Sequence, residues 1–203
     1  MKTLGVTGGI GSGKSTVCRM LEDLGARVFY SDEEGKRLLV EDPEARREIV
    51  EAFGPRSYRD DGELDRAYLA ETVFGDEQRL ARINAIVHPR VRDRFMSAVK
   101  GAREEGVPLM VQEAALIFES GADRFLDAVV VVDAGRELRI ERVRQRDRSS
   151  REMVEARMDH QLPPEELRRR ADYVIDNSGT LEETRRQVER IYREMEGSLK
   201  GSF

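Results

Sequence analysis

Short apolar runs and longer amphipathic segments alternate along the chain. Each apolar run is long enough for one strand and is bounded by glycine, proline or charged residues. The stretch Ala128–Val132 is apolar throughout, which is typical of a strand covered on both faces, as in a parallel sheet. The pattern predicts strands at Leu4–Thr7, Arg27–Tyr30, Pro108–Gln112, Asp127–Asp133 and Tyr173–Ile175.

Between these runs, apolar residues recur at helical spacing. Val17, Met20, Leu21 and Leu24, for example, fall on one face of a helix. In the longest helical segment we expect Pro89 to break or kink the helix, because proline lacks a backbone N–H. The pattern predicts helices at about Val17–Leu24, Asp32–Val40, Pro43–Phe53, Asp65–Val73, Asp76–Arg103, Gly135–Arg146 and Leu181–Met195.

The segment between the first strand and the first helix reads Gly-Gly-Ile-Gly-Ser-Gly-Lys-Ser over residues 8–15. This matches the phosphate-binding loop, in which glycines let backbone N–H groups surround an anion at a helix start. Lys14 can reach the β- and γ-phosphates, and the Ser15 hydroxyl can coordinate Mg²⁺. The flanking strand and helix disfavour a chance glycine-rich turn. The motif predicts nucleotide binding without separating a kinase from a switch GTPase or a motor.

Strands that alternate with helices predict an α/β fold with a parallel sheet. With the loop, the expected class is a P-loop NTPase fold of three α/β/α layers around a mostly parallel five-stranded sheet. We expect one domain over residues 1–203. Two stretches have the character of insertions, a helical one at about 55–106 and a charged one at about 142–170. Such insertions commonly build acceptor-binding regions and lids.

Composition narrows the range of partners. The net charge is −5 and charges of both signs are mixed without a long basic stretch, so we expect no nucleic-acid partner. No apolar run approaches the about 20 residues of a membrane span, and no signal peptide is visible. We therefore expect no membrane association and a cytoplasmic location. The single cysteine, Cys18, excludes a disulfide within the chain and is expected to be buried.

Charged residues at two places suggest phosphoryl-transfer chemistry. Asp32 follows the second strand, where a carboxylate can orient an acceptor hydroxyl and take its proton. An equally good interpretation is that Ser31 and Asp32 cap the next helix. Arg142 and Arg146 share a helix face in the charged segment, and arginines that close over a triphosphate neutralise developing charge. Of the two, Arg146 is the first candidate.

Two polar positions have both a binding and a structural interpretation. His88 precedes Pro89, and either hydrogen-bonds a substrate or caps a kinked turn. Asn177 opens an Asn-Ser-Gly turn after the last strand. That turn either packs on an adenine or only joins strand to helix.

Taken together, these motifs resemble the dephospho-CoA kinase family over nearly the whole chain. The string Thr-Gly-Gly-Ile-Gly-Ser-Gly-Lys-Ser at residues 7–15 is close to the family's signature and far more specific than the bare loop pattern. Ile86–Pro89 resembles its His-Pro motif, and Gln145–Asp147 its lid motif. Gln161 with Ala171–Gly179 resembles its C-terminal signature. Four motifs in the right order argue against coincidence.

The resemblance implies ATP-dependent phosphorylation of the ribose 3′-hydroxyl of dephospho-CoA, giving CoA and ADP, with Mg²⁺ as the metal. The partners are then small molecules, and the sequence leaves the oligomeric state open. The expected site residues are Asp32, Lys14 and Arg146 for catalysis; Gly11, Ser12, Gly13, Lys14, Ser15, Thr16, Arg142 and Asn177 for the nucleotide; His88 and Glu119 for the acceptor; and Ser15 for the metal.

The chain departs from the family's pattern in two motifs. Tyr30 and Ser31 replace the Asp and Ala of its Asp-Ala-Asp motif, so Asp32 is the one carboxylate there. Ala115 replaces the proline of its Pro-Leu-Leu-x-Glu segment, which here ends at Glu119. Two alternatives stay open. A nucleoside monophosphate kinase shares the loop and lid, whereas a switch GTPase is disfavoured because its Asn/Thr-Lys-x-Asp motif is missing.

Overall fold

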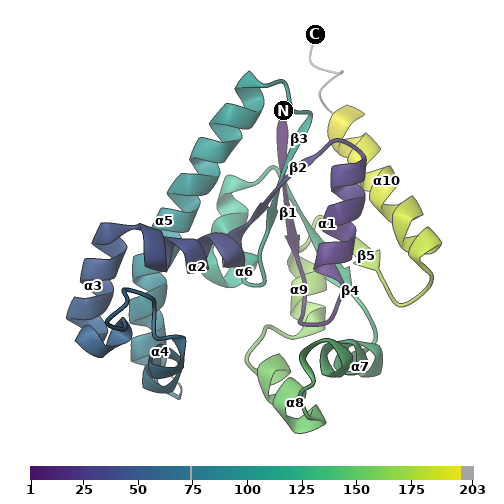
Figure 1. Ribbon diagram of the computed structural model, residues 1–203. Helices are drawn as coiled ribbons and strands as arrows, with labels where there is room; N and C mark the ends of the chain where they lie inside the picture. Colours follow the sequence, from purple (N-terminus) through teal and green to yellow (C-terminus); the bar gives the residue numbers. More distant parts are fainter. Residues whose placement is uncertain (74, 198–203) are drawn as a thin grey trace. The chain divides into compact units, whose positions relative to one another are not determined.

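The computed structural model describes residues 1–73 and 75–197, which fall into two compact units (Figure 1). One unit holds Met1–Tyr30 and the chain from Ala98 onward, and the other holds Ser31–Ser97. The second unit thus begins directly after the second strand, earlier than the helical stretch expected at about 55–106. The helices predicted at Asp32–Val40 and Pro43–Phe53 belong to it because their apolar faces join its core.

A parallel sheet of five strands forms the centre of the first unit, in the order β2-β3-β1-β4-β5. All four neighbouring pairs are parallel, as predicted. The observed bounds differ from the predicted ones by one or two residues at most. The strands are β1 (Lys2–Thr7), β2 (Arg27–Tyr30), β3 (Leu109–Glu113), β4 (Ala128–Asp133) and β5 (Tyr173–Asp176).

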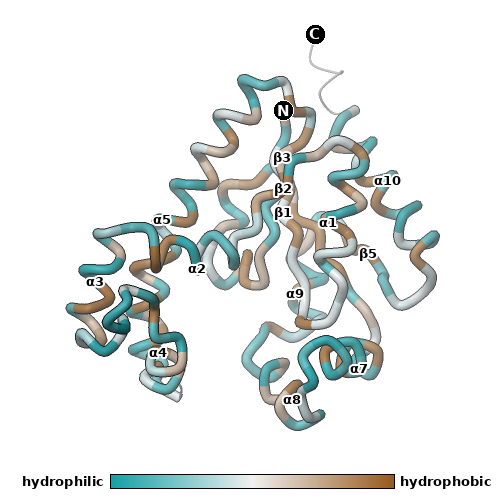
Figure 2. The backbone as a smooth tube through the Cα atoms, in the orientation of Figure 1, coloured by the Kyte–Doolittle hydropathy of each residue, from teal (hydrophilic) through white to brown (hydrophobic). Residues whose placement is uncertain are grey.

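The helices of the first unit cover both faces of this sheet. They are α1 (Lys14–Asp23), α6 (Ile117–Ser120), α7 (Arg136–Asp147), α8 (Arg151–Asp159), α9 (Pro164–Arg170) and α10 (Leu181–Gly197), with the 3₁₀ helix η2 (Ala122–Phe125). Val130 and Val132 of β4 join a buried cluster with α1 and α10, whereas Val129 and Val131 join one with α6 and α9. Successive strand residues point to opposite faces, so an apolar run such as β4 packs on two helical layers at once. Figure 2 shows the apolar character of β1 and its neighbours. The predicted three-layer α/β/α arrangement is confirmed for this unit.

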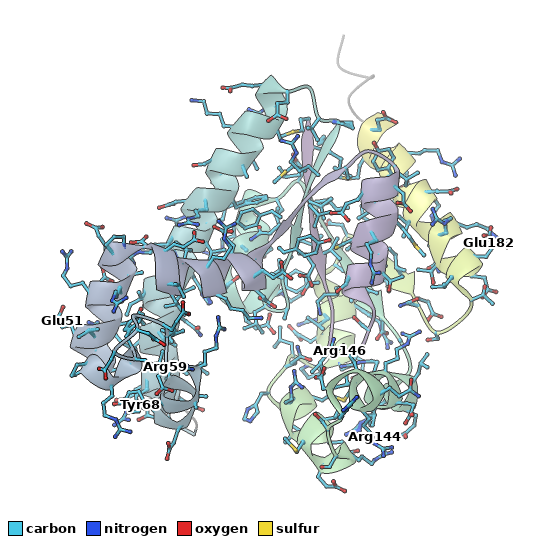
Figure 3. The ribbon with its side chains drawn as sticks, in the orientation of Figure 1. Glu51, Arg59, Tyr68, Arg144, Arg146 and Glu182 are labelled. Carbon is cyan, nitrogen blue, oxygen red and sulfur yellow. The ribbon has the colours of Figure 1, made fainter. Side chains whose placement is uncertain are left out.

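The second unit is helical. It contains α2 (Ser31–Glu41), α3 (Pro43–Phe53), η1 (Pro55–Ser57), α4 (Arg66–Val73) and most of α5 (Glu77–Glu104), whose last turns belong to the first unit. Ile49, Phe53, Leu69 and Ile86 are buried in its core. The Tyr68 hydroxyl, labelled in Figure 3, donates to the Phe53 carbonyl at 2.8 Å. Among the described residues no helix is long and apolar enough to cross a bilayer.

Pro89 lies inside α5, which continues through it from Glu77 to Glu104. Of the two expected effects of Pro89, a break or a kink, the break is therefore wrong. Proline removes one backbone donor, the one that would bond to the Ala85 carbonyl. Next to the proline, Arg90 donates from its guanidinium to the Ile86 carbonyl at 2.8 Å and pairs with Glu48 of α3 at 2.7 Å. Ile86 is buried, so this turn of α5 is anchored in the core of the second unit.

Candidate functional site

The predicted strand, loop and helix are all observed, and they place the glycine-rich loop at the carboxyl end of β1. The loop runs from Gly8 to Gly13, and α1 begins at Lys14. Gly13, the cap of α1, has a φ of 100°, a conformation that favours glycine. Within the described residues the backbone N–H groups of Gly11, Gly13 and Ser15 donate to no protein acceptor. These are the donors that a phosphate-binding loop presents to an anion.

Lys14 folds back over the loop. Its Nζ donates to the Gly8 carbonyl at 2.9 Å, so the ammonium group lies above the start of the loop. The Ser15 side chain is exposed at the first turn of α1, and Thr16 beside it is half-buried. The Thr16 N–H closes a turn on the Gly13 carbonyl at 3.0 Å. The loop thus carries a cation and a free hydroxyl within one helical turn.

Asn177 supports the loop from behind. Its side-chain amide donates to the Ser12 carbonyl at 2.7 Å, and its Oδ1 accepts from the Thr184 hydroxyl at 2.9 Å. Only 3% of Asn177 is exposed. A Cβ on Gly13 would run into the Asn177 amide, so glycine is required there for close approach as well as for its φ. The structure therefore brings Asn177 to the loop, with its side chain occupied by protein partners.

The two lid arginines of α7 differ in their surroundings. Arg142 donates to the carbonyls of Ser12, at 3.4 Å, and of Asn177, at 3.0 Å, and so lies against the loop. Arg146 is exposed near the end of α7, where Figure 3 labels it with Arg144. Its guanidinium pairs with Asp147 at 2.6 Å.

Asp147 also forms an ion pair with a second arginine. Its carboxylate accepts from Arg157 of α8 at 2.9 Å. Hydrogen bonds from Arg146 and Arg157 hold the pKa of Asp147 well below its usual range. The carboxylate therefore stays ionised and keeps Arg146 oriented at the start of the predicted lid.

Glu113 is a functional candidate that the sequence analysis missed. It is the last residue of β3, is 8% exposed, and lies in register with Val6 of β1 and Tyr30 of β2. Burial, reinforced by the negative charge of Glu113, raises the pKa of the Cys18 thiol, which is buried as predicted. Burial is also the main reason that the pKa of Tyr30 rises to about 12. The sequence feature that could have indicated it is a single carboxylate at the end of the apolar strand β3, which pairs with the strand that leads into the phosphate-binding loop.

In the second unit the structure brings together two residues predicted for the acceptor. Asp32 lies in the first turn of α2 and is exposed, and His88 of α5 is half-buried. Burial lowers the pKa of His88, and the negative charge of Asp32 raises it in part. The carboxylate is therefore within electrostatic range of the imidazole. Asp32 lies within α2, and its carboxylate has no hydrogen bond or ion pair with another described residue.

Glu119 is in a different situation. It is exposed in α6 of the first unit, and no hydrogen bond or ion pair with another described residue holds it. Helix α6 itself was not predicted. It follows β3 directly and anchors Ile117 and Phe118 in the buried cluster under the sheet.

The donor set of the first unit fits a magnesium ion held together with a nucleotide. Among the described residues no group of three or more His, Cys, Asp or Glu side chains could enclose a metal ion. Mg²⁺ usually keeps several waters and takes one or two protein oxygens with substrate phosphates, so a closed cage is not expected. The exposed Ser15 hydroxyl provides one such oxygen, and Glu113 ends the neighbouring strand.

Comparison with known proteins agrees with this geometry. The family model for dephospho-CoA kinase matches residues 2–183. A dephospho-CoA kinase of Salinibacter ruber is 54% identical over 192 residues, which cover 95% of this chain and 96% of that protein.

Two solved structures have the same fold over nearly their full lengths. TT1252 from Thermus thermophilus superposes with a TM-score of 0.82 at 37% identity, covering 95% of this chain and 97% of that one. Dephospho-CoA kinase from Campylobacter jejuni has a TM-score of 0.71 at 28% identity, covering 97% and 98%. With the phosphate-binding loop formed and the family model matched over most of the sequence, the chain belongs to the dephospho-CoA kinase family.

Proposed function

We propose that this protein transfers the terminal phosphoryl group of ATP to the ribose 3′-hydroxyl of dephospho-CoA, releasing CoA and ADP. The observation that carries the proposal is the loop at the carboxyl end of β1, with its free N–H groups and Lys14. Membership of the dephospho-CoA kinase family supplies the acceptor.

On the nucleotide side, the protein would act by positioning and electrostatics. The N–H groups of Gly11, Gly13 and Ser15 donate to the phosphate oxygens. Lys14 leaves the Gly8 carbonyl and turns toward the β- and γ-phosphates, as a mobile point charge can. Arg142 and Arg146 add charge from α7 as the lid closes. Asn177 and Ser12 keep the loop in shape, and Thr16 packs beside the metal-binding hydroxyl.

Magnesium would be held by the Ser15 hydroxyl, with Glu113 contacting its water shell. The bound ion neutralises phosphate charge and orients the terminal phosphate. The protein's own part at this point is to place the Glu113 carboxyl group at the end of β3 and to present Ser15 at the start of α1.

On the acceptor side, Asp32 is the proposed base. The 3′-hydroxyl oxygen forms a bond to the γ-phosphorus while the bond from that phosphorus to the β-bridging oxygen breaks. The hydroxyl proton passes to the Asp32 carboxylate, and ADP leaves. His88 would bind the acceptor next to this carboxylate, and Glu119 is a further contact for it. Tyr30 occupies the position of the first Asp of the family's motif and contributes no second carboxylate.

An ADP-release assay with and without dephospho-CoA tests the proposal. We expect turnover that depends on dephospho-CoA and little turnover with AMP. Asp32→Asn and Lys14→Ala should each lower kcat by about 100- to 1000-fold while the fold persists, since each removes one electrostatic group. A strong preference for AMP would point to a nucleoside monophosphate kinase. ATP binding without transfer to either acceptor would point to a binding module.

Near-normal kcat in Asp32→Asn would reject Asp32 as the base and leave positioning as the mechanism. A cytoplasmic location and the lack of a nucleic-acid partner stay predictions from the sequence.

A further inference from the structure

Ile10 is held from three directions, although it lies in the middle of a glycine-rich loop. Its N–H donates to Oε1 of Gln161 at 2.8 Å, and its carbonyl accepts from Nε of Arg139 at 3.0 Å. Its side chain packs on the buried cluster of Ile140, Val143 and Val154, which joins α7 to α8. No other loop residue described above has both backbone groups bound by side chains.

These contacts restrain the part of the loop that its own sequence leaves free. The Ile10 N–H belongs to the peptide group that follows Gly9, and the Ile10 carbonyl to the one that precedes Gly11. Glycine permits many backbone conformations, so both peptide planes can rotate unless hydrogen bonds hold them. Within the loop, the Gly9 carbonyl of the first plane accepts from the Ser12 N–H at 3.1 Å. Gln161 holds the first plane and Arg139 holds the second. The free N–H group of Gly11 lies in this second plane, on the side opposite the Ile10 carbonyl, so the bond from Arg139 fixes the direction of that N–H as well.

Arg139 is an unusual side chain to find in this position. It is only 6% exposed, and its guanidinium packs on Gly9 so closely that a Cβ there would overlap it. Burial lowers the pKa of Arg139, and the charge of Asp133 raises it in part. A buried cation is costly unless it is bound, and its hydrogen bond goes to the phosphate-binding loop. The buried guanidinium of Arg139 thus contacts the loop backbone and not only the side chains of the core.

Both restraining residues come from the chain that follows β4. Arg139 is on α7, and Gln161 lies between α8 and α9, inside the predicted lid at about 142–170. The two line one cavity of about 790 Å³ at the ends of β4 and β5. The lid segment is therefore attached to the loop through Ile10 by the Gln161 hydrogen bond and by the apolar contact with Val143 and Val154, and Arg139 adds a second hydrogen bond from just before the lid.

We propose that Arg139 and Gln161 are positioning residues that hold the phosphate-binding loop ready for ATP and couple its shape to the lid. The proposal rests on ATP being the nucleotide bound at this loop. It adds a role for two side chains that contact the loop backbone and need not touch the reacting atoms.

The test compares substitutions that differ in one hydrogen-bonding atom. Gln161→Met keeps the length of the side chain and removes the acceptor, whereas Gln161→Glu keeps an acceptor oxygen. Arg139→Met removes the donor, whereas Arg139→Gln keeps an amide donor. The matched controls are His160→Ala, beside Gln161 and exposed, and Arg144→Ala, which pairs with Glu141 on the surface of α7.

ATP affinity is measured first by calorimetry without acceptor, which separates this test from the identity of the acceptor. We expect each Met variant to weaken ATP binding about three- to tenfold, the effect of one hydrogen bond. The KM for dephospho-CoA should change less than the KM for ATP. Gln161→Glu and Arg139→Gln should recover most of the affinity, and both controls should match the wild type. Because both residues restrain Ile10, the double Met variant should lose less than the product of the single losses.

Hydrogen exchange of the Ile10 amide, followed by NMR, provides a readout that does not depend on activity. We expect it to exchange faster in Gln161→Met, while amides of β1 keep their protection. ATP affinity and Ile10 exchange equal to wild type in Gln161→Met would overturn the proposal. The proposal would also be overturned if Gln161→Glu bound ATP no more tightly than Gln161→Met. The same holds if the loss of affinity in the double Met variant equalled the product of the two single losses. If Gln161→Met does not fold, the proposal stands on Gln161→Glu and Arg139→Met, with the same outcomes deciding it.

Discussion

The side-chain amide of Asn177 donates to the Ser12 carbonyl at 2.7 Å, across 165 positions of the chain. This bond joins the turn after β5 to the loop after β1, and Thr184 orients the amide from the other side. Asn177, one of the residues expected at the nucleotide, thus supports the phosphate-binding loop in this structure.

Asn177→Ala should lower the free energy of unfolding by about 1–3 kcal/mol, because it leaves buried polar groups unpaired. ATP affinity should fall with it, since the Ser12 carbonyl loses the shorter of its two side-chain hydrogen bonds and keeps the one from Arg142. Denaturant unfolding and ATP titration measure the two effects. Glu182→Ala is the control, because Glu182 is exposed at the start of α10 and pairs with the exposed Arg186. Unchanged ATP affinity in a folded Asn177→Ala variant would contradict the supporting role.

Gly13→Ala should be strongly unfavourable. Its φ of 100° costs an L-residue about 1–2 kcal/mol, and the new Cβ meets Asn177 as well. We expect a lower melting temperature and loss of ATP binding. Gly101→Ala is the matched substitution inside α5, where a Cβ meets nothing within 4 Å. Gly101→Ala should raise the free energy of unfolding by about 0.5–1 kcal/mol. A change of the same sign in Gly13→Ala and Gly101→Ala would refute the argument.

Arg146→Ala should lower kcat by about 100- to 1000-fold, the usual cost of removing a transition-state charge. The fold should persist, because exposed ion pairs such as Arg146 with Asp147 contribute little stability. Steady-state kinetics and thermal unfolding measure both. Arg144→Ala, two residues earlier on α7, should behave as wild type. Equal losses in the two variants would mean that general surface charge, and not Arg146, supports catalysis.

Asp32→Asn should lower the pKa of His88, because the variant removes the carboxylate that favours the imidazolium form. NMR titration of the histidine ring follows this directly, and a His160→Gln variant assigns the two histidine signals. Glu33→Gln, the next residue on α2, is the control and should leave the pKa unchanged. If the pKa of His88 is the same in Asp32→Asn as in the wild type, the two side chains are apart in solution.

His88 should also make stability depend on pH. Its pKa in the folded protein is lower than in the unfolded chain, so the unfolded state binds more protons in the window between the two values. The stability that goes with a neutral His88 is complete above about pH 6.5 and declines as the pH falls toward the folded pKa. His88→Gln should flatten that part of the curve in denaturant titrations between pH 5 and 8. An unchanged slope would assign the pH dependence to other groups.

Much of the fold was predictable because the signals are local. The apolar run in β4 required cover on both faces, and the helical spacing from Val17 to Leu24 marked α1. The loop at residues 8–15 was recognisable because its glycines satisfy backbone requirements of the loop itself. The sequence did not show that α5 continues through Pro89, where tertiary contacts such as that of Arg90 with Glu48 of α3 anchor the helix.

The amino-acid sequence by itself determined the order of strands and helices, the phosphate-binding loop and the charge placed at its helix start, since periodicity and glycine spacing act over a few residues. Only the tertiary structure decided that Glu113 is buried beside β1, that Asn177 supports Ser12, and that Arg139 and Gln161 hold Ile10. These partners are over a hundred positions apart in the chain. They meet because the parallel sheet brings the carboxyl ends of β1, β3, β4 and β5 to one edge, which no local pattern records.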